Sequence, residues 1–317
     1  MLLSLLLLAA APAPVVRRIP APEAHQGVAT DGTHVYAIAN SMIGKYDKRT
    51  GRRVAQWRGD PKFFPHTNSC AVVGAELVCA ASNYPAVPMA SSVEVFDTAT
   101  MRHKRTTSLG PGRGSLTWLD WHAGSWWAAY ANYDGRGGEP GRNHRYTQLV
   151  RLDADMRERE AWRFPDTILA RFTPMSTSGG AWRADGTLTI TGHDHPELYV
   201  LRVPTAGSTL EHVETILIAT PGQTIDWDPD EPDLLWSIDR GAKMLVVSRV
   251  KFSGNDRKDP SASRRRRPTS SGAKLWPEAD GPLYGCNKRK ADTRILKAHS
   301  RSANRQVRSV GCISPSR

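Results

Sequence analysis

The chain has 317 residues, with 43 Lys and Arg against 31 Asp and Glu and a formal net charge of +12. Residues 253–317 carry 16 Lys and Arg against 5 Asp and Glu, or +11, so the rest of the chain is nearly neutral and lacks the basic surface of a nucleic-acid-binding domain. After the N-terminus no stretch approaches the roughly 18 consecutive apolar residues of a membrane-spanning helix, which excludes a membrane span in the mature chain.

Residues 1–13 are predicted to be a signal peptide. Leu5–Leu8 and Ala9–Ala11 form an apolar run that is too short to span a bilayer and ends in small residues. No Lys or Arg precedes this run, and Pro12 and Pro14 follow the two candidate cleavage sites, which is unusual for a leader. A buried N-terminal segment is the alternative. We expect export, and therefore a periplasmic or secreted protein.

Five diverged repeats follow. Each opens with a small polar cluster, enters an apolar strand, turns at Gly or Asp, and returns in a second strand that ends in Asn, His or Asp. The openings are Ala24–Gly27, His66–Ser69, Gly114–Thr117, Ser176–Gly179 and Gly222–Ile225. Counted from positions 25, 67, 115, 177 and 223, their spacings are 42, 48, 62 and 46 residues. A period of about 40–50 residues is typical of propellers.

Turn and strand signals within the repeats favour antiparallel meanders. Most of the first turns are Asp-Gly or Gly-Ala pairs that suit two-residue hairpins, as at Asp31-Gly32 and Gly74-Ala75. Third strands are predicted at Met42–Asp47, Val93–Asp97, Gln148–Asp153, Glu197–Arg202 and Met244–Arg249. No segment has a sustained helical period. The sequence therefore predicts an all-β, five-bladed β-propeller with four antiparallel strands per blade, spanning residues 15–252.

The fifth repeat lacks a fourth strand of its own. We expect Val15–Pro20 to supply it by pairing with Met244–Arg249, which would close the ring and remove an exposed sheet edge. The Trp residues fall mostly in the strands of the third to fifth repeats, where packing between blades is favoured over ligand stacking.

Residues 24–250 resemble secreted bacterial β-propeller proteins of the YVTN and cycloisomerase-like repeat type. The resemblance lies in the repeat openings and in Ser82-Asn83-Tyr84-Pro85, Ser115-Leu116-Thr117-Trp118 and Gly192–Tyr199. It implies the propeller fold. It implies no single function, because propellers include lyases, isomerases, hydrolases and pure binding proteins, and lactonising propellers usually have seven blades.

One mouth of the central tunnel is predicted to be polar. The start of the first strand and the end of the second strand lie side by side in an antiparallel hairpin, so these positions from all five blades meet at one mouth. They are His25, Gln26, Asn40, His66, Asn68, Asn83, Tyr84, Ser115, Thr117, Asn132, Tyr133, Ser176, Ser178, His193, Asp194, His195, Gln223, Asp239 and Arg240. We expect them to bind a small polar or anionic ligand.

Three readings of the histidines remain open. His25, His66 and either His193 or His195 could ligate a divalent metal, backed by Asp194, Asp239 or Glu197, and so support lyase or isomerase chemistry. Alternatively, they act as metal-free acid–base groups, or they hydrogen-bond one another and water. A non-enzymatic scaffold that binds other proteins is the alternative function.

The sequence also predicts a disulfide. If Gly74-Ala75 is a two-residue turn, Val73 pairs with Glu76, and counting outward places Cys70 opposite Cys79 in a non-hydrogen-bonded pair. The Cα atoms of such a pair are about 4.5 Å apart, within reach of a disulfide. Two free buried thiols are the alternative.

The third repeat carries an insertion, Asp134–Tyr146, that leaves from the same mouth. Its arginines, Arg136, Arg142 and Arg145, could bring charge to an anionic ligand as a lid, or the insertion is a solvated loop.

Residues 253–317 are predicted to be a disordered basic tail, because they combine high charge with few aliphatic residues. The tail is either a solvated appendage, which a change of reading frame could also produce, or a segment that contacts polyanions. Nucleic acid is expected to contact it only non-specifically, and we expect a monomer.

Overall fold

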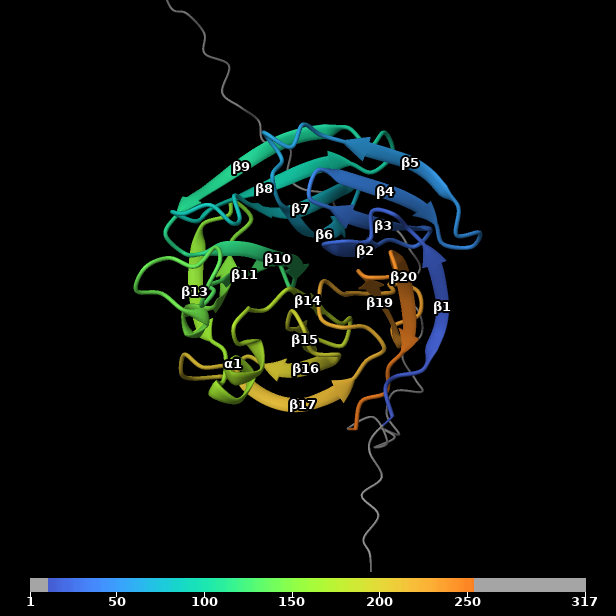
Figure 1. Ribbon diagram of the computed structural model, residues 1–317. Helices are drawn as coiled ribbons and strands as arrows, with labels where there is room; N and C mark the ends of the chain where they lie inside the picture. Colours follow the sequence, from blue (N-terminus) through green and yellow to red (C-terminus); the bar gives the residue numbers. More distant parts are fainter. Residues whose placement is uncertain (1–10, 254–317) are drawn as a thin grey trace, which may run out of the picture. The chain divides into compact units, whose positions relative to one another are not determined.

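The computed structural model describes residues 11–253, which form five antiparallel four-stranded sheets arranged around a common centre (Figure 1). Each sheet has its strands in consecutive order, except that one contains the first strand of the chain. The structure is a five-bladed β-propeller, which confirms the predicted fold class.

The five sheets are named blades 1 to 5 in chain order. Blade 1 consists of β2 (Gly27–Thr30), β3 (His34–Ala39), β4 (Met42–Asp47) and β5 (Arg53–Arg58). Blade 2 consists of β6 (Thr67–Val73), β7 (Glu76–Ser82), β8 (Ala90–Asp97) and β9 (His103–Pro111). Blade 3 consists of β10 (Ser115–His122), β11 (Ser125–Ala131), β12 (Gln148–Leu152) and β13 (Glu158–Arg163). Blade 4 consists of β14 (Gly179–Trp182), β15 (Leu188–Thr191), β16 (Glu197–Arg202) and β17 (Glu211–Leu217). Blade 5 consists of β18 (Asp226–Trp227), β19 (Leu234–Asp239), β20 (Met244–Arg249) and β1 (Val15–Pro20).

Burial falls from the inner to the outer strand of a blade. In blade 1 all of β2 and nearly all of β3 are buried, whereas β5 alternates between exposed and half-buried residues. The inner strands are covered on both faces by the neighbouring blades, so they consist of nearly continuous apolar or small residues. The outer strand faces solvent, which explains why β5 carries arginines at both ends.

The N-terminal strand closes the ring. β1 pairs antiparallel with β20, with Ile19 opposite Leu245, and it runs along the outside of blade 5 (Figure 1). Ile19 is only 2% exposed and belongs to an apolar cluster that joins blade 5 to blade 1 through Val28 and Leu245. The predicted pairing of Val15–Pro20 with Met244–Arg249 is confirmed.

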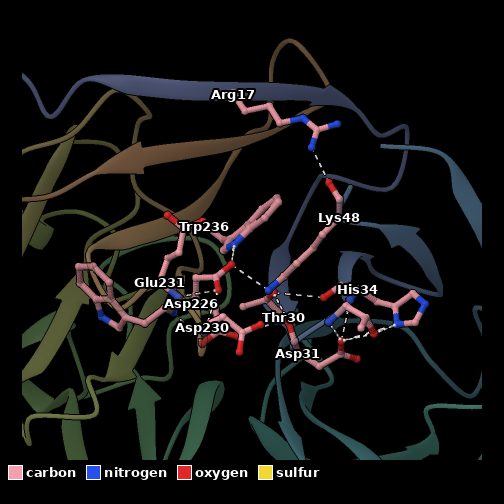
Figure 2. Close-up of polar contacts among 12 residues, drawn as sticks. Arg17, Thr30, Asp31, His34, Lys48, Asp226, Asp230, Glu231 and Trp236 are labelled. Carbon is pink, nitrogen blue, oxygen red and sulfur yellow. Dashed lines mark hydrogen bonds and ion pairs between the residues drawn. The ribbon is translucent and has the colours of Figure 1, made fainter. Parts of the chain in front are cut away.

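Polar contacts reinforce the junction where the chain closes, between blades 5 and 1. The Lys48 ammonium group donates to Asp228 at 2.8 Å, and the indole N–H of Trp236 donates to the same carboxylate. The backbone N–H of Thr30 donates to the carboxylate of Asp226 at 2.7 Å; Figure 2 shows Lys48 and Trp236 pointing toward one another beside Asp226. Blade 5 is therefore bound to blade 1 through charge as well as through apolar packing.

The junction of blades 3 and 4 is largely aromatic. Trp118, Trp127 and Trp162 pack with Ile190 and Tyr199 in one buried cluster. Trp118 is fully buried and its indole N–H donates to the hydroxyl of Thr177 in blade 4. These contacts agree with the interpretation of the tryptophans as packing residues between blades.

Two short helical segments were not anticipated. They are η1 (His144–Tyr146) in the insertion of blade 3 and α1 (Asp166–Phe172) between blades 3 and 4. Ile168, Leu169 and Phe172 of α1 are buried. Seven residues include only two turns, so the apolar spacing does not repeat and gives no periodic signal.

Cys70 and Cys79 form a disulfide with a Cα–Cα distance of 3.9 Å. The register around it pairs Val73 with Glu76 and Cys70 with Cys79, as predicted. Both cysteines are buried within the hairpin of β6 and β7. The bond therefore joins the two inner strands of one blade.

Two predicted segments fall outside the description. The signal peptide, residues 1–13, lies outside it up to residue 10, and the basic tail lies outside it from residue 254 onward. Among the residues described, no helix is long and apolar enough to cross a membrane.

Candidate functional site

A cavity of about 300 Å³ lies at the mouth where the first strands start and the second strands end. All five blades contribute to its walls. It is lined by His25, Gln26, Asn40, His66, Asn68, Tyr84, Pro85, Thr117, Tyr133, Arg136, Met175, Ser178, His193, Gln223 and Arg240. Its volume is at the lower end of the roughly 300–1,000 Å³ of small-molecule sites, so it suits a small ligand.

Most of the predicted site residues meet in this central cavity. His25, His66 and His193 line it together, although they come from blades 1, 2 and 4. They meet because the start of the first strand and the end of the second strand are adjacent in every antiparallel hairpin. Asp194 lines a neighbouring cavity instead.

Three predicted residues are used by the scaffold. The amide of Asn83 donates to the carbonyl of Pro88 and accepts from the N–H of Ala90, which shapes the loop between β7 and β8. Ser115 is fully buried and donates to the hydroxyl of Ser82. Asn132 is also fully buried, where its amide donates to the backbone of the insertion at Tyr146. These side chains line neither cavity at the mouth, and each makes side-chain hydrogen bonds within the scaffold.

Two further predicted residues lie beside the mouth. The carboxylate of Asp239 is 3.5 Å from the guanidinium of Arg18 on β1 and accepts from the N–H of Ala242. His195 is half-buried, and its carbonyl accepts from the N–H of Glu197 in the turn before β16. Neither lines the central cavity or its neighbour.

Pro85, Met175 and Arg136 line the cavity but were not among the predicted strand-end positions. Met175 immediately precedes the opening cluster of blade 4, so extending each opening by one residue would have found it. Pro85 and Arg136 come from loops, whose course the strand pattern does not specify.

Arg240 is the charged centre of the cavity. Its Nη1 lies 3.3 Å from Nε2 of His193 and its Nε lies 3.5 Å from Nε2 of His25. Across residues 11–253, no carboxylate lies within 4.0 Å of its guanidinium, and burial lowers its pKa. Asp194, the nearest acidic contributor, instead accepts from His193 at 2.6 Å. A half-buried guanidinium without a paired carboxylate keeps N–H donors that can bind an anion.

His25 and His66 are uncharged at neutral pH. Burial, with a smaller contribution from the positive charge of Arg240, lowers the pKa of each to about 4. Nδ1 of His66 lies 3.1 Å from the amide oxygen of Asn40, to which Gln26 also donates at 2.9 Å. Neutral imidazoles place no second fixed charge beside Arg240.

The histidines do not fit the predicted divalent metal site. The guanidinium of Arg240 lies against both His25 and His193, where a second cation would be repelled. Within the described part of the chain, no three His, Cys, Asp or Glu side chains are grouped so that they could hold a metal ion. His25, His66 and His193 are therefore not arranged as the predicted set of metal ligands.

An aromatic wall, formed by Tyr84 and Tyr133, also lines the cavity. The rings of Tyr84 and Tyr133 meet edge-on with centroids 5.2 Å apart, and His66 lies 5.1 Å from Tyr84. Met175 packs against the same apolar cluster as the two tyrosines and also lines the cavity. The cavity thus combines a cationic side with an apolar side.

Of the three insertion arginines, only Arg136 lines the cavity. Arg142 donates to the carbonyl of Gly112, and Arg145 lies 3.6 Å from Asp166 at the start of α1. The insertion is also fixed by His144, whose ring contacts Asp134 at 2.7 Å and Thr173 at 3.0 Å. The expected role of the insertion at the mouth is thus limited to Arg136.

A second cavity of about 310 Å³ adjoins the first between blades 4 and 5. It is lined by His193, Asp194, Pro221, Gly222, Gln223, Arg240 and Gly241. His193, Gln223 and Arg240 line both cavities. Gln223 has a φ of 114°, a backbone conformation that residues other than glycine rarely adopt. Such strained residues are concentrated at functional sites.

Comparisons with known proteins do not assign the chain to a family. No family model and no curated protein matches the chain. The PQQ-bound aldose sugar dehydrogenase of Streptomyces coelicolor is 12% identical, over 75% of this chain and 99% of that one, with a TM-score of 0.47. A luciferin-regenerating enzyme is 11% identical over 75% and 96%, with a TM-score of 0.44. The β-propeller domain of Cps50 (Swd1) from Myceliophteria thermophila is 12% identical over 71% and 84%, with a TM-score of 0.39. With TM-scores below 0.5, these neighbours carry no argument about this chain. The propeller fold rests on the five sheets, and the resemblance to the secreted bacterial repeat type stays a prediction.

Proposed function

We propose that this protein binds a small anionic ligand in the central cavity, with Arg240 as the principal contact. The observation that carries the proposal is the half-buried guanidinium that lines the cavity without a carboxylate within 4.0 Å among residues 11–253. A guanidinium offers five N–H donors, and the two imidazoles near it occupy at most two. The remaining donors suit the two oxygens of a carboxylate.

The surroundings favour an anion over a cation. Arg136 brings a second positive charge to the wall, and the neutral His25 and His66 add none that would have to be desolvated. Asp194 contributes only from the adjoining cavity. The proposal concerns binding; metal-assisted lyase or isomerase chemistry finds no support in the arrangement of the histidines, and the protein-binding scaffold stays a prediction.

The test is a calorimetric titration of full-length protein with short aliphatic carboxylates and with the matching neutral amides. We expect the carboxylates to bind and the amides to bind at least about tenfold more weakly, since a charge-assisted hydrogen bond is worth about 1.5–3 kcal/mol. Arg240→Gln should weaken carboxylate binding by a similar factor. Arg58→Gln, a change at an exposed outer-strand arginine, is the control. Equal affinity for acids and amides, or an unaffected Arg240→Gln variant, would contradict the proposal.

We also infer that the protein works outside the cytoplasm. The disulfide between Cys70 and Cys79 supports this, because structural disulfides persist in oxidising compartments. The inference is tested by expressing the chain in its host and fractionating the cells; recovery only in the cytoplasm with both thiols reduced would contradict it.

A further inference from the structure

The amide side chains of the central cavity present unused donors and unused acceptors. The amide NH₂ of Gln26 and the oxygen of Asn40 satisfy one another, and the NH₂ of Asn68 donates to the carbonyl of Leu116. The oxygens of Gln26, Asn68 and Gln223 and the NH₂ of Asn40 then have no hydrogen-bond partner among residues 11–253. Gln26, Asn68 and Gln223 line the cavity, and each is at least nine-tenths buried.

Open donors and open acceptors together select the chemistry of a ligand. A carboxylate can only accept hydrogen bonds, so it satisfies Arg240 but leaves the three amide oxygens unpaired. A hydroxyl group both donates and accepts, so several hydroxyls match this mixed set. A ligand that covers these polar atoms without hydrogen-bonding to them pays about 1–3 kcal/mol for each, which gives hydroxyl groups on the ligand a strong advantage over hydrocarbon.

The aromatic wall completes the arrangement. Tyr84, Tyr133 and Met175 offer apolar surface in the same cavity as the amides and Arg240. A ligand that carries hydroxyls on its edges and C–H groups on its faces can use both surfaces at once. Rings of this kind are found in sugars.

We propose that the ligand is a sugar acid, a polyhydroxylated ring or chain with one carboxylate. Its carboxylate binds the guanidinium of Arg240, its hydroxyls bind the amides of Gln26, Asn40, Asn68 and Gln223, and its C–H face lies against Tyr84 and Tyr133. This rests on the proposed anion site and specifies what occupies the rest of the cavity. The adjoining cavity beyond Arg240 and Gln223 gives room for a substituent on the same molecule.

The proposal is tested by calorimetric titration of full-length protein with three probes. Glucuronate carries the charge and the hydroxyls, glucose carries only the hydroxyls, and hexanoate carries only the charge. We expect glucuronate to bind at least about tenfold more tightly than either of the others, which corresponds to about 1.4 kcal/mol. Gln26→Met removes the amide at nearly constant volume, and should weaken glucuronate binding by about 2–10-fold while leaving hexanoate binding unchanged. Arg58→Gln again serves as the control.

The outcomes separate the two proposals. If hexanoate binds as tightly as glucuronate and Gln26→Met changes neither, the sugar-acid proposal is overturned and the anion site remains. If glucose binds as tightly as glucuronate and Arg240→Gln has no effect, the anion site itself is overturned. Binding of none of the three probes overturns both.

Discussion

The pKa of the His66 side chain depends on the environment of the cavity. It is half-buried between Asn40 and Tyr84, and both burial and the charge of Arg240 oppose its protonation. Its pKa falls from an ordinary value near 6.5 to about 4. The folded state therefore binds a proton less readily than the unfolded state, and stability must depend on pH.

We predict that the free energy of unfolding falls as the pH drops from 7 toward 4. The unfolded chain takes up a proton at His66 near pH 6.5 whereas the folded chain resists it until about pH 4, so stability is present above this window and is lost within it. One pKa unit corresponds to about 1.4 kcal/mol, so a pKa lowered from 6.5 to about 4 lets His66 contribute at most about 3.5 kcal/mol.

The check is urea denaturation of the wild type and of His66→Asn at pH 7 and pH 4.5. Asn retains a donor for the oxygen of Asn40 but does not titrate, so the variant should lose less stability between the two pH values. Asp120 and Asp226, whose pKa values burial raises, titrate in both proteins and cancel in the comparison. An identical pH dependence in the two proteins would contradict the assignment.

Prediction of individual residues worked where the adjacency of strand ends in a hairpin decided the outcome. Gln26, Asn68 and Gln223 lie within three residues of the start of a first strand and do line the cavity. Asn132 satisfies the same rule, but its amide is used by the backbone of the insertion at Tyr146. The position of a residue at a strand end places its Cα at the mouth, but it does not tell whether a nearby backbone group hydrogen-bonds the side chain. The sequence therefore could not distinguish Asn132 from the residues that line the cavity.

At the scale of elements, the insertion of blade 3 supports the aromatic wall. Gly137 has a φ of 81°, and a Cβ placed there would lie 2.4 Å from the ring of Tyr84. The insertion thus approaches Tyr84 so closely that only glycine fits both the backbone conformation and the space. The same loop brings Arg136 to the cavity.

Gly137→Ala is predicted to displace Tyr84 and to weaken binding of the glucuronate probe by several fold. The left-handed conformation alone costs a residue with a Cβ about 1–2 kcal/mol, and the contact with the ring adds to this. Gly135→Ala is a matched control in the same loop, because a Cβ there meets nothing within 4 Å. The comparison is made by calorimetric titration together with thermal denaturation. Equal affinities of the two variants would show that the loop does not position the ring.

Strands could be predicted from the sequence where turn residues mark their ends. The Gly74-Ala75 turn alone gave the register of β6 and β7 and, with it, the disulfide between Cys70 and Cys79. α1 has no comparable sequence signal. Its residues Ile168, Leu169 and Phe172 are buried by tertiary contacts, such as that of Phe172 with Tyr199 of blade 4. Its existence depends on tertiary contacts rather than on local pattern.

At the scale of the whole molecule, closure determines whether five blades form a ring. The sheet of blade 5 takes its outer strand from the beginning of the chain, so the first and last strands are bound to one another. Lys48, Asp228 and Trp236 hold blade 5 against blade 1 near the centre, whereas β1 holds blade 5 at the rim. Loss of either contact would leave blade 5 with an exposed edge or face.

Ile19→Ala is predicted to destabilise the whole propeller rather than β1 alone. Ile19 is 2% exposed within the cluster that joins blade 5 to blade 1, so its truncation leaves a cavity at the junction and should cost about 2–4 kcal/mol. Val16→Ala, on the same strand but 53% exposed, should cost no more than about 0.5 kcal/mol. Urea denaturation followed by both Trp fluorescence and far-UV circular dichroism measures the effect. Coincident transitions at lower urea in Ile19→Ala would show that closure stabilises all five blades cooperatively, because the tryptophans report mainly on blades 3 to 5 while circular dichroism reports on every strand. A loss no larger than that of Val16→Ala would show instead that β1 adds a strand without holding the ring together.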